Sequence, residues 1–390
     1  MKKAPRSIGI IAFPVDKHGE LSADTGAGNV PFSHLVDILR SMYRTLYVIT
    51  GNEQRVLFKK DKRMHLFEVR HRGGTINYIL TQIRLALKVF ILSRKVGAWV
   101  FFIGAEAMML PALMARLLRR PVILALTGFP AKISSREKTL GYQIIDSLSR
   151  QTIRLATRLV AYSPKIIQER NLNRYRRKIV LAQEHFLDFG QFKILKPVIQ
   201  RGNLVTYIGR LEEGKGIPNL LAAINIIAEH RSDIHFLIGG DGPLRSAVEE
   251  YLKQPHLKGK VEYMGWISHE KLPEYLNKAK LLVLPSYTEA LPNIILEAMA
   301  CGTPVLTTGV GAITDVIEDG ETGFILPRNS PDAIAEEVVR ITDDPRLGRI
   351  AEKARNLVRK RYTYESAVRS YRAVFATKPS AVPFRQENPR

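Results

Sequence analysis

The sequence predicts an α/β protein made of two doubly wound domains of the Rossmann type. The chain has 390 residues, of which 45% are hydrophobic, and this is more than a single core usually organises. In both halves, apolar runs of strand length alternate with amphipathic segments of helix length, the pattern of parallel sheets covered by helices. The polar stretch KPVIQRGN, residues 196–203, has Pro and Gly ahead of a new strand and marks the domain boundary.

These features divide the chain into three segments. We expect an N-terminal domain over residues 1–198, a C-terminal domain over residues 199–362, and a C-terminal helix with a frayed tail over residues 363–390. The last helix is expected to pack back on the N-terminal domain. Parallel sheets bind ligands at the carboxyl ends of their strands, so functional residues are expected in the turns that follow the strands.

Each expected element is an apolar run bounded by turn residues. In the first half, strands are expected at residues 7–13, 45–50, 98–104 and 121–128, and helices at 32–43, 75–94 and 105–120. In the second half, strands are expected at residues 204–209, 234–240, 261–265, 280–286, 303–308 and 323–327, each followed by turn residues and then a helix.

Cysteine usage and the apolar runs limit the class of protein. Cys301 is the single cysteine, which excludes a disulfide within the chain, and metal-binding spacings such as C-x-x-C and H-E-x-x-H are absent from the sequence. The N-terminal stretch is interpreted as a first strand, because no cleavage site follows it. No apolar run approaches the 18 residues of a membrane span. We therefore expect a cytoplasmic protein with no structural metal.

The charge is concentrated in one half of the chain. Residues 1–200 contain 34 Lys and Arg against 13 Asp and Glu, a balance of +21, whereas residues 201–390 contain 25 against 24, a balance of +1. Such a concentration of positive charge attracts nucleic acid, anionic lipid or another polyanion. A basic surface that is merely solvated remains the alternative.

The octet GRLEEGKG, residues 209–216, follows the first strand of the second half. It resembles a Walker A loop but has Gly216 where Ser or Thr would hold magnesium, and its loop is short. Arg210 and Lys215 add two cations at the mouth of a helix that Pro218 initiates, which favours a site for a diphosphate. The glycines that let the backbone approach a ligand are Gly209, Gly214 and Gly216. A glycine-rich connection with incidental cations is the alternative.

A second glycine-rich turn, IGGDGPL at residues 238–244, follows the next strand. Gly239, Gly240 and Gly242 leave room beside the sheet for a planar or phosphate-bearing ligand. Asp-Gly is also an ordinary turn sequence, so this stretch is informative only together with the octet.

The third stretch, LPSYTEALPNIILEAMACGTPVL at residues 284–306, predicts a short helix from Pro292 to Cys301. Proline suits a first helical turn, and Gly302 can cap the C-terminus. Glu289 then lies in the preceding loop. Glu297 lies one to two turns into a helix that is otherwise almost wholly apolar, where an unpaired charge is costly. Carboxylates accept hydrogen bonds from hydroxyl pairs, so one of the two can bind a sugar while the other binds a ribose.

Together the octet, the GGDG turn and the E-x7-E pattern EALPNIILE resemble the nucleotide-sugar domain of retaining glycosyltransferases of family 4 over residues 203–328. The resemblance implies a GT-B fold, in which two Rossmann-like domains face each other across a cleft. It implies that Arg210 and Lys215 neutralise the donor diphosphate, that Glu289 holds sugar hydroxyls and that Glu297 holds the ribose. Further donor-binding positions implied by it are Gly209, Gly240, Gly242, Gly265, Trp266, Leu291, Pro292 and Asn293.

The N-terminal half follows this family less closely. Thr127 and Gly128 stand where the family commonly has an acceptor-side histidine, and TGAGN at residues 25–29 is the best candidate for its glycine loop. Gly28 and Gly128 are therefore the expected acceptor-side positions. His34 and His185 are interpreted as partly buried structural histidines.

The sequence as a whole predicts a retaining glycosyltransferase that uses a UDP-, GDP- or ADP-sugar and needs no cofactor. Metal is expected to be unnecessary, because Arg210 and Lys215 supply the countercharge that magnesium supplies in P-loop enzymes. The alternative is an inactive, donor-binding regulatory partner, which the missing histidine suggests. Nucleic-acid binding is not expected, because the basic cluster YRRK at residues 175–178 is isolated.

The acceptor is expected to be a glycan or a lipid-linked glycan precursor, reached from an anionic membrane surface. The best candidate for membrane contact is TINYILTQIRLALKVFILSRK, residues 75–95, which has the composition of a helix lying in a membrane interface. The alternative is an ordinary helix packed on a sheet. The apolar residues at helical spacing are Ile76, Ile79, Leu80, Ile83, Leu87 and Phe90, and the cations are Arg84, Lys88, Arg94 and Lys95.

Overall fold

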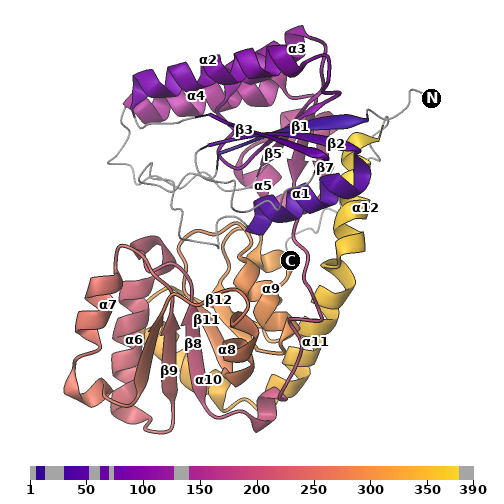
Figure 1. Cartoon of the computed structure of the whole chain (residues 1–390). Helices are drawn as coiled ribbons and strands as arrows, with labels where there is room; N and C mark the ends of the chain where they lie inside the picture. Colours follow the sequence, from indigo (N-terminus) through magenta and orange to yellow (C-terminus); the bar gives the residue numbers. More distant parts are fainter. Residues whose placement is uncertain (1–5, 14–29, 52–61, 70–73, 127–139, 377–390) are drawn as a thin grey trace. The chain divides into compact units, whose positions relative to one another are not determined.

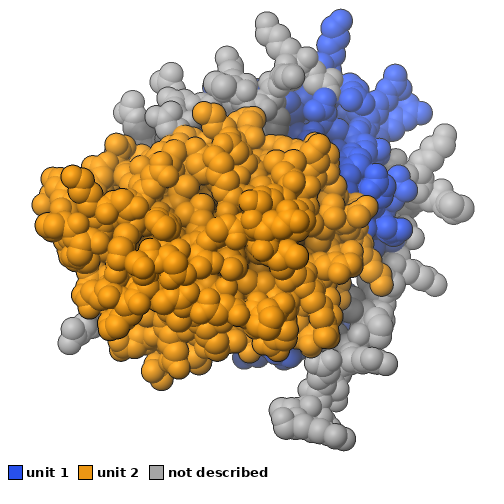
Figure 2. Space-filling view, turned by 90° about the horizontal axis from the view of Figure 1, so that it is seen from below, with its two compact units in different colours: residues 1–185, 364–390 blue, residues 186–363 orange. Residues whose placement is uncertain are grey.

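The computed structural model describes the chain outside residues 1–5, 14–29, 52–61, 70–73, 127–139 and 377–390 (Figure 1). The chain forms two compact units. Unit 1 comprises residues 1–185 and 364–390, and unit 2 comprises residues 186–363 (Figure 2).

Unit 1 is built on a seven-stranded, fully parallel sheet with strand order β3-β2-β1-β4-β5-β6-β7. The central strands are buried on both faces, as parallel strands covered by helices must be. Four of these strands agree with the sequence prediction, whereas β3, β6 and β7 were not predicted. The strands are β1 Ser7–Ala12, β2 Thr45–Thr50, β3 Met64–Glu68, β4 Trp99–Phe102, β5 Val122–Leu126, β6 Arg158–Ala161 and β7 Ile179–Leu181.

Helices α2, α3 and α4 form one layer of unit 1, and α1 packs with α12 (Figure 1). In α12, the hydroxyl of Tyr364 donates to the carbonyl of Asp37 at 3.2 Å, and the Tyr43 and Phe375 rings meet edge to face at 5.3 Å. The last helix of the chain is therefore part of unit 1. The helices of unit 1 are α1 Val30–Met42, α2 Thr75–Leu92, α3 Met109–Leu117, α4 Leu140–Leu155, α5 Pro164–Glu169 and α12 Tyr364–Phe375.

Unit 2 is a second fully parallel sheet, with strand order β10-β9-β8-β11-β12-β13. Every strand of this sheet lies where the sequence predicted one. The strands are β8 Leu204–Ile208, β9 His235–Gly239, β10 Val261–Gly265, β11 Leu281–Leu284, β12 Val305–Thr308 and β13 Phe324–Leu326. The helices are α6 Ile217–His230, α7 Arg245–Tyr251, α8 Leu272–Lys278, α9 Asn293–Ala300, α10 Pro331–Thr342 and α11 Leu347–Arg361.

The units divide at residues 185/186 and 363/364, where the sequence predicted boundaries at 198/199 and 362/363. Residues 186–203 belong to unit 2 because buried polar groups fix them there. The amide of Leu195 donates to Asn277 Oδ1 at 2.7 Å. The Arg201 guanidinium, which is buried, donates to the carbonyls of Lys196, Leu276, Ala279 and Cys301 and to the hydroxyl of Thr303.

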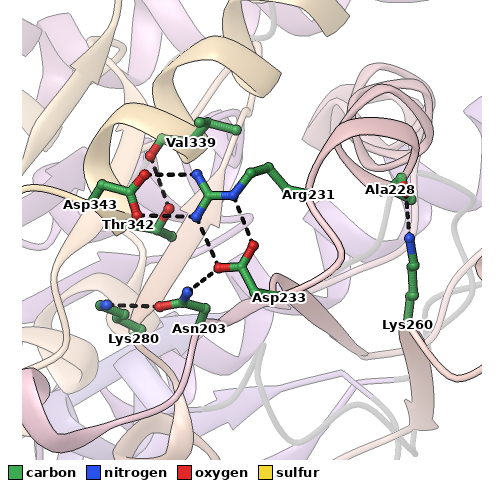
Figure 3. A network of polar contacts seen from close by, with 9 residues as sticks. All are labelled: Asn203, Ala228, Arg231, Asp233, Lys260, Lys280, Val339, Thr342 and Asp343. Carbon is green, nitrogen blue, oxygen red and sulfur yellow. Dashed lines mark hydrogen bonds and ion pairs between the residues drawn. The ribbon is translucent and has the colours of Figure 1, made fainter.

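A polar network ties the amino-terminal side of the unit 2 sheet together (Figure 3). The Arg231 guanidinium, just after α6, bridges Asp233 at 2.8 Å and Asp343, just after α10, at 2.7 Å. Asn203 Nδ2 donates to Asp233 at 2.6 Å, and Lys280 donates to Asn203 Oδ1 at 2.8 Å. These contacts lie at the edge of the sheet opposite the carboxyl ends of its strands, so they stabilise unit 2 away from the expected ligand site.

Candidate functional site

The order of strands in unit 2 reverses direction between β8 and β11, which lie side by side. In a doubly wound sheet, the loops at such a switch point diverge and leave a crevice beyond the carboxyl ends of the strands. The loop after β8 is the octet at residues 209–216, and the loop after β11 is residues 285–292. The two loops that the sequence predicted as functional therefore leave neighbouring strands at the switch point.

The octet ends in a short 3-10 turn, Glu213–Lys215, followed by Gly216 and helix α6. Gly216 has φ of +73°, and a Cβ there would lie 2.0 Å from the carbonyl oxygen of Pro285 in the neighbouring loop. The amide of Tyr287 also donates to the carbonyl of Gly214 at 3.0 Å. The two loops thus touch through backbone atoms, which requires glycine at position 216.

This contact brings Lys215 and Glu289 together. Lys215 Nζ lies 2.6 Å from Glu289 Oε1, and the hydroxyl of Ser286 donates to the same oxygen at 2.8 Å. The lysine side chain is 24% exposed and the glutamate side chain 9% exposed. The sequence predicted both residues at the site but assigned them to different parts of the ligand. The structure shows that they form a largely buried ion pair.

Arg210, the other predicted cation, lies in the same octet. Its Nε is 3.3 Å from Glu212 Oε2. Its backbone carbonyl accepts a hydrogen bond of 2.8 Å from the hydroxyl of Tyr207, whose pKa is raised well above its ordinary value, mainly by burial. The buried tyrosine therefore anchors the backbone from which Arg210 extends.

The GGDG turn after β9 is packed against the octet. Gly240 has φ of +134°, and a Cβ there would lie 1.8 Å from the carbonyl oxygen of Gly209. The amide of Leu211 donates to the carbonyl of Asp241 at 2.9 Å, and the amide of Gly240 to the carbonyl of Gly265 at 2.7 Å. The sequence analysis explained these glycines by close approach of a ligand. The structure shows that Gly240 is also required for the two loops to pack against each other.

Helix α9, Asn293–Ala300, is the helix predicted from Pro292 to Cys301, shorter by one residue at each end. Pro292 is the N-cap and provides no side-chain acceptor, so the backbone amides of the first turn have no side-chain cap. At the other end, Gly302 has φ of +67° and donates to Met299, while Thr303 donates to Ala298. This is a Schellman motif, which ends the helix after two turns.

Glu297, on α9, is buried and has a partner that the sequence analysis missed. His269 Nε2 lies 2.8 Å from Glu297 Oε1. This hydrogen bond raises the pKa of His269 above its ordinary value of 6.5, while partial burial of the ring opposes the increase. The sequence signal was weak, since a histidine after a strand end is a common turn residue and its partner follows 28 positions later.

The other predicted positions differ in exposure, and two of them lie outside the described residues. Trp266, beyond the end of β10, is exposed, whereas Leu291 is buried in the loop before α9. Gly265 has φ of +61°, a conformation that favours glycine. Gly28 and Gly128, the predicted acceptor-side positions, lie outside the described residues. Within the described residues, no group of three or more His, Cys, Asp or Glu side chains is placed to hold a metal ion.

Helix α2 of unit 1 contains most of the segment at residues 75–95, for which the sequence predicted membrane contact. All six apolar side chains named for it are exposed on α2, and they are joined by Ile91. Leu113 and Leu117 on α3 and Ile144 and Ile145 on α4 are exposed as well. Residues 75–120 contain seven Lys and Arg and a single acidic residue, Glu106. In the described part of the chain, no helix is both long and apolar enough to span a bilayer.

Solved structures identify the fold. The chain superposes on Anabaena HepE, solved in complex with UDP and glucose, with a TM-score of 0.72 and 17% identity, covering 94% of this chain and 99% of that one. It superposes on a sucrose-phosphate synthase from Thermosynechococcus elongatus with a TM-score of 0.72 and 20% identity, covering 96% of this chain and 100% of that one. The predicted fold class, GT-B, is confirmed.

Sequence relatives identify the family. The chain is 31% identical over 297 residues to the alpha-D-kanosaminyltransferase of Streptomyces kanamyceticus, covering 71% of this chain and 76% of that protein. It is 24% identical over 283 residues to the 2-deoxystreptamine N-acetyl-D-glucosaminyltransferase of Niallia circulans, covering 68% and 72%. Residues 193–362 match the family model described as glycosyl transferases group 1. The chain belongs to this family of glycosyltransferases.

Proposed function

We propose that the protein transfers a sugar from a nucleoside diphosphate sugar to an acceptor with retention of anomeric configuration. The observation that carries this proposal is the ion pair between Lys215 and Glu289 at the switch point of unit 2, within the segment matched by the family model. A cation beside a carboxylate, at the end of a parallel strand, provides one group for a diphosphate and one for sugar hydroxyls.

The loops offer a path for the donor along the sheet. Strands β10, β9, β8 and β11 are consecutive neighbours, and their ends span about 14 Å at roughly 4.8 Å per strand. Trp266 follows β10 and Glu289 follows β11, with the octet between them. We place the base near Trp266, the ribose at Glu297, the diphosphate at Arg210 and Lys215, and the sugar at Glu289. Neighbours solved with UDP support a nucleotide donor.

The chemistry in this proposal depends on the leaving group. Breaking the bond between the anomeric carbon and the phosphate oxygen leaves negative charge on the diphosphate, which Arg210 and Lys215 stabilise. The acceptor hydroxyl attacks the same face and gives its proton to the departing phosphate oxygen, so configuration is retained without a protein base. We propose that metal is not required, because the two cations supply the charge compensation.

The donor test uses a thermal-shift panel of UDP-, GDP- and ADP-sugars, because a ligand that binds only the folded state raises its stability. One nucleotide should raise the melting temperature of the wild-type protein, and Arg210→Ala should lose about 10² in transfer with that donor, the typical effect of removing one preorganised charge-stabilising donor. EDTA should leave transfer unchanged. A rate that falls to background in EDTA and returns with Mg²⁺ would contradict the metal-independent mechanism.

We further propose that the acceptor is lipid-linked and that the exposed face of α2 binds the anionic cytoplasmic surface of a membrane. Exposed apolar side chains and a nearly uniform positive charge on the same helix layer support this proposal. The apolar side chains match the acyl boundary of a bilayer, and the positive charge matches anionic headgroups. Helix α2 packs on the core through Leu85, Val89 and Leu92, and the six apolar residues named above stay exposed.

Vesicle sedimentation tests membrane binding. The protein should sediment with anionic vesicles at low salt, be largely released at high salt, and ignore neutral vesicles, because each cation near the surface contributes on the order of 1 kcal/mol. The double variant Ile76→Ser and Phe90→Ser should weaken capture. Ile199→Ser, an exposed isoleucine in unit 2, is the matched control. Indifference to anionic vesicles at every salt concentration would favour a soluble acceptor.

A further inference from the structure

Helix α9 carries one acidic side chain on an otherwise apolar sequence, NIILEAMA. Only 5% of the Glu297 side chain is exposed, and a carboxylate removed from water is costly unless it accepts hydrogen bonds. His269 Nε2 lies 2.8 Å from its Oε1. A carboxylate can only accept, so Nε2 carries the proton and donates it.

His269 is itself held in place by the segment that enters unit 2. The Phe192 ring, which is buried, lies 5.2 Å from the imidazole, centroid to centroid, at 59°. Gln191 Nε2 donates to the backbone carbonyl of His269 at 3.2 Å. Asp188 fixes this segment by accepting from the amides of Gly190 and Gln191. The imidazole therefore points at Glu297 because the chain around it is fixed.

The hydrogen bond has a geometric consequence for the second carboxylate oxygen. The terminal torsion of a glutamate is broad, so an unrestrained carboxylate presents its lone pairs in many directions. A donor fixed at Oε1 also fixes the direction in which Oε2 offers its lone pairs. Hydroxyl recognition depends on that direction, because hydrogen bonds weaken steeply away from linearity.

The charged surroundings agree with a donor role for His269. The pKa of His269 is raised, first by the hydrogen bond that it donates to Glu297 and further by the charges of Glu297 and Glu270, whereas burial lowers it. Cys301, which follows α9, has a pKa raised by burial to about 12, so its thiol is neutral and adds no negative charge near the carboxylate.

We propose that His269 is a positioning residue for nucleotide recognition: it orients the Glu297 carboxylate so that this group selects the ribose hydroxyls of the donor. The inference rests on the proposed function, which places the ribose at Glu297. It adds a residue outside the motifs that identified the site, and it predicts an effect that depends on the sugar of the nucleotide rather than on its phosphates.

The experiment measures dissociation constants by calorimetry for UDP and 2′,3′-dideoxyuridine diphosphate, and for the guanosine pair if GDP binds more tightly. The wild-type protein should prefer the ribonucleotide by about 10²-fold, since a site built for hydroxyls rejects an analogue that lacks them. In His269→Ala this preference should fall to about 10-fold or less, with affinity for the dideoxy compound nearly unchanged, because one hydrogen bond to a charged group is lost.

His269→Gln should restore most of the preference, because an amide Nε2 can donate to the same oxygen. His256→Ala is the matched control. Its Nε2 lies 2.5 Å from Asn225 Oδ1 on the exposed surface of unit 2, and its loss should leave both dissociation constants unchanged.

Three outcomes separate the inference from the proposed function. If His269→Ala weakens both nucleotides equally, the histidine contacts the ligand directly or only stabilises the fold, and the inference is wrong. If Glu297→Gln abolishes the preference while His269→Ala leaves it intact, the ribose site stands and the positioning role is wrong. If Glu297→Gln leaves the preference intact, the placement of the ribose in the proposed function is itself wrong.

Discussion

Replacing Lys215 with alanine removes the ammonium group that lies 2.6 Å from Glu289 Oε1. Two effects are expected, one on transfer and one on stability. If Lys215 stabilises the leaving diphosphate, the rate of transfer should fall by about 10²–10³, or roughly 2.7–4 kcal/mol, the range measured when one preorganised donor is removed.

The effect on stability follows from what is left behind. Glu289 remains 9% exposed and keeps the hydrogen bond from Ser286 at 2.8 Å. Removing one partner of a fully buried pair costs about 3–5 kcal/mol. Because the lysine is 24% exposed and Ser286 still donates, we expect about 1–3 kcal/mol. At roughly 2–4 °C per kcal/mol for a domain of this size, the melting temperature should fall by several degrees.

The assay combines steady-state transfer kinetics with calorimetric melting on the same preparations. Glu289→Gln in the Lys215→Ala background removes the uncompensated carboxylate, so it should restore melting temperature without restoring transfer. Lys253→Ala is the control, because Lys253 forms an exposed pair with Glu250 at 2.6 Å and such pairs contribute little. Wild-type transfer by a folded Lys215→Ala protein would refute the assignment of this lysine.

Three further predictions concern unit 2. Glu297→Gln should weaken binding of the free nucleoside diphosphate, whereas Glu289→Gln should mainly impair use of the sugar-bearing donor; equal effects on nucleoside diphosphate affinity in titration calorimetry would mean that the two carboxylates are assigned the wrong way round. Gly216→Ala should lower the melting temperature and transfer together, because φ of +73° and a backbone carbonyl 2.0 Å from the new Cβ both oppose it; an unchanged melting curve would contradict this. The Arg231 guanidinium lowers the pKa of Asp343 below its ordinary value of 3.8, so the pair stabilises the fold above that pH and this stability is lost as pH falls through the folded pKa. Asp343→Asn should therefore melt lower than wild type at pH 6 and converge with it in acid, and a constant difference at every pH would count against the ion pair.

The strands of unit 2 were predictable because their burial makes them continuous apolar runs. Strands β11 and β12 are buried along their whole length, and each is flanked by proline or polar turn residues. In unit 1, β7 has only three residues, too few for a periodic signal. β3 begins at a polar turn and is half-exposed at the edge of the sheet, so its pattern is weak.

The residues proposed for the site can be chosen from the sequence one by one, but their contacts with one another cannot. Arg210 and Lys215 stand out as cations beside glycines, and Glu297 as a charge inside an apolar helix. Glu289 was chosen because it begins the E-x7-E pattern that ends at Glu297. Their pairing could not be predicted, because Lys215 and Glu289 are 74 positions apart and meet only when β8 and β11 become neighbours in the sheet. His269 was missed for the same reason, since its partner lies on a helix that follows a different strand.

The pairing of Lys215 with Glu289 gives a physical reason for the two carboxylates to act differently. If the diphosphate binds at Lys215 as proposed, Glu289 competes with the incoming phosphate for the lysine, so binding of a bare nucleoside diphosphate must weaken that ion pair. A sugar attached to the diphosphate offers hydroxyl donors that satisfy the displaced carboxylate. In the proposed function, the sugar end of the site therefore favours the intact donor over the product nucleotide. Glu297 does not lose its partner to an incoming phosphate, because that partner is His269 and not a cation proposed to bind phosphate. We therefore expect nucleotide binding to depend on Glu297 and discrimination between donor and product to depend on Glu289, eight residues earlier in the sequence.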